Sequence, residues 1–69
     1  MQYMVIIEHG EDGYGAYVPD LPGCVAVGDT HEEVLQLIQE AIEFHLEMMQ
    51  EDGLDIPAPS AQSAYVAVM

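Results

Sequence analysis

Two prolines and a glycine within seven residues, Val18–Cys24, constrain the fold of this chain more than any other feature. Pro19 and Pro22 lack a backbone N–H, which excludes regular strand pairing across this stretch. Gly23 permits the positive φ that a sharp change of chain direction requires. The stretch is therefore predicted to be a tight structural loop, with a scaffolding role and not a catalytic one.

Extended segments are predicted on both sides of this loop. Tyr3–His9 is a β-branched apolar run, and Tyr14–Val18 resumes an extended pattern after the Asp-Gly turn in Glu11–Gly13, so the two form a hairpin. Cys24–Val27 is predicted to be a third short strand, and Ala64–Met69 a last one.

A helix is predicted to begin after Thr30. Thr30 and Glu33 have the spacing of a capping box, in which the threonine hydroxyl accepts from the Glu33 amide and the Glu33 carboxylate reaches back. Gly53 is predicted to end the helix at the C′ position, before an extended linker over Leu54–Ser60. Apolar residues at three- and four-residue steps predict the face that covers a sheet: Val34, Ile38, Ala41, Ile42, His45, Leu46 and Met49.

These elements predict a small α+β fold of order β-β-β-α-β, with a three- to four-stranded sheet and one packed helix. The whole chain, residues 1–69, is expected to form one domain. So short a chain buries only about 60% of the surface that its unfolded form exposes, so self-association into a dimer or tetramer is expected.

The charge is entirely one-sided. The chain has 13 Asp and Glu residues and no Lys or Arg, which gives a formal net charge of -13. Binding to DNA, RNA or anionic lipid requires basic side chains, so direct nucleic-acid binding and membrane docking are predicted to be absent. No signal peptide or membrane span is apparent, and a cytoplasmic protein is expected. The acidity has two explanations, a saline habitat or a basic partner, and composition does not decide between them.

No catalytic, metal or cofactor site is predicted. The three histidines, His9, His31 and His45, do not have metal-ligand spacing, and His45 falls on the apolar face of the helix. Cys24 is the only cysteine, which rules out an intrachain disulfide and a CxxC site, and no basic side chain is available to activate its thiol. An enzymatic function is therefore not expected.

The outer face of the helix is the strongest candidate for partner binding. Glu40, Glu43, Glu47 and Glu51 stand three or four residues apart, and each like-charge pair costs about 0.2–0.5 kcal/mol. This acidic row is either a solvated surface or a docking face for a cationic protein.

Two residues of the proline-rich loop are further candidates for partner contact. These are Asp20 and Leu21, which lie between the two prolines. The Leu21 side chain is expected either to anchor the fold or to insert into the partner.

The sequence resembles the HicB antitoxin family along almost its whole length. The resemblance rests on the string PDLPGC, then on Gly28-Asp29-Thr30 and Glu33, and on the EDG and IPAP strings after the helix. It implies a core that is likened to a partial ribonuclease-H fold without its catalytic carboxylates and to a double-stranded-RNA-binding domain. It also implies neutralisation of a HicA toxin, a small basic ribonuclease that cleaves messenger RNA.

Members of this family usually carry a separate DNA-binding domain, whereas this sequence ends at Met69, after the last predicted strand. A stand-alone form without that domain is therefore expected. Two functions remain open: an antitoxin-type module that covers a basic HicA-like ribonuclease, and a stand-alone acidic homo-oligomer of the same fold with an unrelated partner or ligand.

Overall fold

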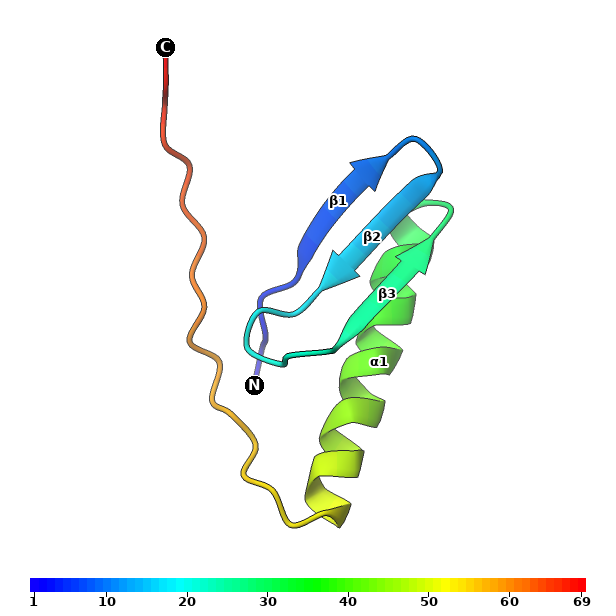
Figure 1. Ribbon diagram of the computed structural model, residues 1–69, viewed down its shortest axis with the longest axis vertical. Helices are drawn as coiled ribbons and strands as arrows, with labels where there is room; N and C mark the ends of the chain where they lie inside the picture. The colour runs from blue at the N-terminus through cyan, green and yellow to red at the C-terminus, as the bar shows by residue number, and fades with distance from the viewer.

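The computed structural model describes all 69 residues and consists of a three-stranded antiparallel sheet covered on one face by a single helix (Figure 1). The strands are β1 (Ile6–Gly10), β2 (Gly13–Tyr17) and β3 (Val25–Gly28), in the spatial order β1-β2-β3. The helix, α1 (His31–Glu51), packs against β2 and β3. The predicted hairpin, third strand and helix are confirmed, with strand ends displaced by one to three residues.

The register of the sheet determines which side chains face the helix. Ile7 pairs with Ala16, and Ala16 pairs with Ala26, so these three residues lie in one row on the helix side. The opposite face carries Tyr17 and Val25, which are paired with each other and exposed at 42% and 64%. The sheet is thus covered on one side only.

Half of the core comes from the proline-rich loop and not from regular elements. Val18, Leu21 and Cys24 are at most 3% exposed and pack with Ala16, Val34 and Ile38. The same three loop residues make its backbone bonds: the Leu21 amide donates to Val18 O (3.0 Å), the Cys24 amide to Leu21 O (3.0 Å) and the Val18 amide to Cys24 O (3.2 Å). Pro19 and Pro22 fill the positions between them, where no amide is needed, and Gly23 has the expected positive φ of 84°.

Both ends of α1 follow from local sequence. The Glu33 amide donates to Thr30 Oγ1 at 3.1 Å, as predicted, while the Glu33 carboxylate reaches back one residue further than expected and accepts from the Asp29 amide at 3.2 Å. At the other end Gly53 adopts φ +70°, and the Leu54 amide donates to Met49 O at 2.9 Å. This is a Schellman motif, which satisfies carbonyls that the helix end would leave unpaired.

The predicted fourth strand is not part of the sheet. Residues 54–69 are extended but pair with no strand, and Ala64–Met69 runs clear of β1 (Figure 1). An uninterrupted apolar run with β-branched and aromatic residues favours an extended backbone, but a strand also needs a neighbouring strand for its hydrogen bonds. Three strands and one helix do not by themselves establish the finer likeness to ribonuclease H or to a double-stranded-RNA-binding domain.

Candidate interaction surface

The acidic row of α1 is fully presented to solvent. Glu40, Glu43, Glu47 and Glu51 are all exposed, and none has a cationic partner because the chain has no Lys or Arg. One hydrogen bond involves the row, a long one of 3.4 Å that Gln39 Nε2 donates to Glu43 Oε1. The carboxylates therefore repel one another on the isolated chain and are free to pair with cations from outside.

Apolar side chains border this row, a feature that the sequence interpretation missed. Leu37, Phe44 and Met48 are exposed at 38%, 64% and 47% and lie seven and four residues apart, which puts them on one stripe of the helix. Glu40 follows Leu37 by three residues and precedes Phe44 by four, so it lies between them on the helix surface.

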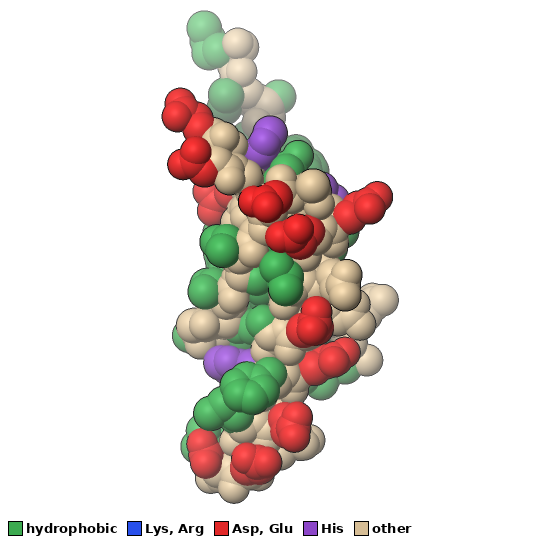
Figure 2. Space-filling model, turned by 90° about the vertical axis from the view of Figure 1, so that its right-hand side faces the viewer, with side chains coloured by type: hydrophobic (Ala, Val, Ile, Leu, Met, Phe, Trp, Pro, Cys, Tyr) green, Lys and Arg blue, Asp and Glu red, His purple; other side chains and the backbone are tan.

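Figure 2 shows the side of the molecule where α1 lies, with both acidic and hydrophobic side chains at the surface. Acidic side chains are scattered there among exposed hydrophobic ones, without a Lys or Arg side chain. The signal was present in the sequence as a second set of apolar residues at helical spacing, beside the set that forms the core. We call Leu37, Phe44, Met48 and the acidic row together the helix surface.

The loop residues expected to contact a partner are used inside the chain. Leu21 is 0% exposed, so its expected partner contact is wrong and its anchoring role is the one that fits. Asp20 accepts hydrogen bonds from the Ser60 amide (3.0 Å), the Ser60 hydroxyl (3.0 Å) and the Ala61 amide (3.1 Å). The Ala61 and Ser60 amides hold the pKa of Asp20 below its usual value, because they favour the ionised carboxylate. Asp20 thus attaches the C-terminal segment to the loop.

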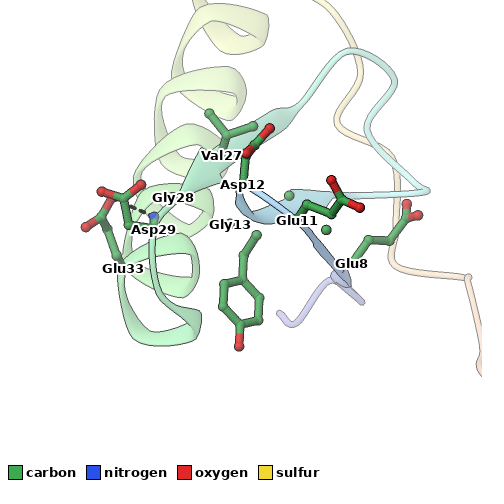
Figure 3. A pocket seen from close by; sticks show the side chains of 11 residues that line it. Glu8, Glu11, Asp12, Gly13, Val27, Gly28, Asp29 and Glu33 are labelled. Atoms are coloured by element: carbon green, nitrogen blue, oxygen red, sulfur yellow. Dashed lines mark hydrogen bonds between the residues drawn. The ribbon is translucent and has the colours of Figure 1, made fainter.

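A shallow depression with an acidic lining lies where the β1–β2 turn meets the junction of β3 and α1 (Figure 3). Five carboxylates line it: Glu8, Glu11, Asp12, Asp29 and Glu33. They approach from different sides and do not converge, and the structure contains no group of three or more His, Cys, Asp or Glu residues placed to bind a metal ion.

Two of the histidines contact a tyrosine, the third is half-buried, and the cysteine is buried. The His9 ring stacks on Tyr14 with ring centroids 4.2 Å apart, and His31 meets the same tyrosine edge-on at 5.8 Å. His45 is half-buried on α1. Cys24 is buried in the core, and burial raises the pKa of its thiol, the opposite of what activates a nucleophile. No arrangement here assembles a catalytic set.

No helix of the structure combines the length and apolar character that crossing a membrane requires. Three surface features are exposed: the helix surface, the uncovered face of the sheet and the extended C-terminal segment.

Comparison with known proteins relates the chain to bacterial antitoxins. The family model described as HicB-like antitoxin of bacterial toxin-antitoxin systems matches residues 3–68. Antitoxin HicB 2 of Photorhabdus laumondii subsp. laumondii is 39% identical over 69 residues, which cover 99% of this chain and 50% of that protein. A 14.9 kDa protein from the rep-hol intergenic region of Haemophilus phage HP1 is 42% identical over 66 residues, 96% of this chain and 50% of that protein.

The chain thus spans about half the length of these two relatives. Among solved structures, a chain of the HicA3 and HicB3 toxin-antitoxin complex superposes with a TM-score of 0.73 at 28% identity, covering 87% of this chain and 70% of that one. A family match over nearly all residues, joined to a shared fold, establishes the relationship. The chain belongs to the family of HicB-like antitoxins of bacterial toxin-antitoxin systems.

Proposed function

We propose that this chain is an antitoxin-type binding module that neutralises a small basic HicA-like ribonuclease by covering it. Family membership carries the proposal, and the solved structural neighbour comes from a complex of HicA3 with HicB3. In this proposal inhibition depends on occupying the toxin's surface. The protein acts as a regulator and not as an enzyme.

Charge supports this partner class. A net charge of -13 attracts a basic protein over distances set by the Debye length, about 8 Å at physiological ionic strength. Such steering raises the association rate more than it slows dissociation. The same charge disfavours nucleic acid as a direct ligand, so the antitoxin is expected to act on the enzyme and not on its RNA substrate.

The helix surface has the composition that such an interface needs. Phe44 is a large aromatic side chain that is 64% exposed, and apolar anchors of this kind dominate binding energies once water is excluded. The flanking carboxylates supply an acidic rim for Arg or Lys side chains of the toxin. We therefore assign toxin contact to Leu37, Phe44 and Met48 together with Glu40, Glu43, Glu47 and Glu51.

The test is coexpression of this chain with a small basic HicA-like toxin, followed by purification and kinetic measurement of the complex. Rescue of growth and a copurifying complex are the expected results. Phe44→Ala is expected to raise Kd about 10-fold to 100-fold, mainly through faster dissociation. Leu35→Ala is the matched control, since Leu35 is also exposed on α1, at 40%, but lies off the acidic row.

Charge is tested separately. The double change Glu43→Lys and Glu47→Lys is expected to slow association and weaken its salt dependence. The matched control, Glu11→Lys with Asp12→Lys, alters net charge equally at the β1–β2 turn. Equal effects of the two pairs would show general steering without a role for the helix surface. Full toxicity with no complex, while this protein remains folded, would reject the antitoxin function in favour of a stand-alone oligomer.

A further inference from the structure

The C-terminal segment is the least protected part of the molecule. Tyr65, Val66 and Val68 are exposed at 102%, 79% and 81%, although their β-branched and aromatic character is typical of strands. The segment also stretches the molecule: the Cα radius of gyration is 13.5 Å, against about 11 Å for a compact chain of this length. An uncharged strand-forming segment that projects in this way is a template for pairing with another strand.

An unpaired strand edge lies on the same side of the molecule. β1 bonds to β2 on one side only, so its other edge has no strand partner. The extended residues Tyr3–Val5 continue this edge toward the N-terminus. In Figure 1 the C-terminal segment runs on the β1 side of the sheet and not on the β3 side. β3 offers a shorter alternative, since its four residues lead directly into Asp29.

The distribution of charge favours a second copy of this chain as the source of the strand that pairs with the β1 edge. All 13 acidic residues lie between Glu8 and Asp55, so residues 1–7 and 56–69 contain none. Two copies that each carry -13 repel one another over most of their surface. The exceptions are the start of the β1 edge and the C-terminal segment, the two segments that can meet with little electrostatic cost.

Internal hydrogen bonds hold the base of the segment in a position to reach outward. The Tyr3 hydroxyl donates to Pro57 O, and Asp20 accepts from Ser60 and Ala61, which fixes the chain up to residue 61. Beyond Ala61 the segment makes no hydrogen bond to the rest of the chain. It is therefore anchored at one end and free along Ala64–Met69.

We propose that two copies exchange these segments, with Ala64–Met69 of each adding as a strand to the β1 edge of the other. The interface is isologous, because the same two segments of each copy take part in it. Main-chain hydrogen bonds bind the added strand, as in strand addition generally. The exchange supplies the fourth strand that the sequence predicts, and it goes beyond the antitoxin function because the helix surface remains free.

Light scattering and isotope-filtered NMR on the full chain test the exchange. A dimer mass at micromolar concentration is expected, with contacts between Ala64–Met69 and β1 in a sample that mixes labelled and unlabelled copies. Contacts in a uniformly labelled sample that vanish in the mixed filter would show a fourth strand within one chain and overturn the exchange. A monomer at these concentrations would overturn it as well.

A variant pair locates the interface. Val66→Pro removes one main-chain donor from a segment that the isolated fold does not use, and it is expected to weaken the dimer about tenfold or more. Val66→Thr, which keeps both the donor and the β-branched shape, is the matched control and is expected to dimerise normally. Circular dichroism checks that both remain folded. Dimers of equal strength in both variants would place the interface elsewhere. That result would overturn the exchange and leave the proposed toxin binding, which uses the helix surface, unchanged.

Discussion

Removal of the Leu21 side chain is the sharpest test of how this small fold is stabilised. Leu21 is completely buried in a core of only six buried residues, three of which belong to the proline-rich loop. Leu→Ala at a buried site costs about 3–5 kcal/mol, from lost burial plus the cavity that remains. A chain of 69 residues has a free energy of unfolding of roughly 3.5–10 kcal/mol, at about 0.05–0.15 kcal/mol per residue.

Leu21→Ala is therefore expected to remove at least about 30% of the free energy of unfolding and, toward the lower end of that range, to unfold the chain. The assay is urea unfolding followed by helical circular dichroism, at one fixed protein concentration because association adds stability. With an m value of about 1 kcal/mol/M, the expected loss moves the midpoint down by about 3 M or more.

Two variants control for this measurement. Leu21→Met keeps the volume and is expected to cost less than about 1.5 kcal/mol. Val27→Ala, at a site that is 77% exposed, is expected to change stability by no more than about 0.5 kcal/mol. A Leu21→Ala variant as stable as the parent but defective in toxin binding would refute the anchoring role and restore Leu21 as a contact residue.

Three further predictions concern capping and charge. Thr30→Ala, which deletes the acceptor for the first-turn amide, is expected to cost about 0.5–2 kcal/mol in thermal unfolding, and Thr30→Ser to recover most of that; equal stabilities would contradict the cap. Added salt is expected to raise Tm, because it screens the repulsion between the carboxylates of the acidic row. Glu47→Lys is expected to reproduce part of this gain, at about 0.2–0.5 kcal/mol for each new ion pair. A Tm unchanged up to about 1 M salt would refute the repulsion. The depressed pKa of Asp20 means that its ionised form stabilises the fold fully above the usual value of 3.8, and that this contribution is lost as pH falls through the lower folded pKa. The Tm of the parent is therefore expected to fall more than that of Asp20→Asn between about pH 5 and about pH 2, and parallel curves would contradict the assignment.

Local signals in the sequence determined the helix, its two ends and the loop. Thr30, Gly53 and the two loop prolines act through atoms a few residues away, and such short-range geometry is legible without a structure. The one departure, the Glu33 bond to the Asp29 amide, is a shift of a single residue within the same turn. The string PDLPGC and the motifs that follow it likewise indicated the family, and in the structure Gly23 of that string has a positive φ and the amides of Leu21 and Cys24 form the bonds of the loop.

Only the tertiary structure decided what is buried and what is paired. Leu21 could face the core or a partner with the same local sequence, and its burial depends on where α1 and β2 close over the loop. Phe44 lies on a helix that carries more apolar side chains than a three-stranded sheet can cover, so it remains exposed. For Ala64–Met69 the pattern specifies an extended backbone, whereas membership of a sheet depends on an edge within reach, and that edge is a property of the folded molecule and its partners.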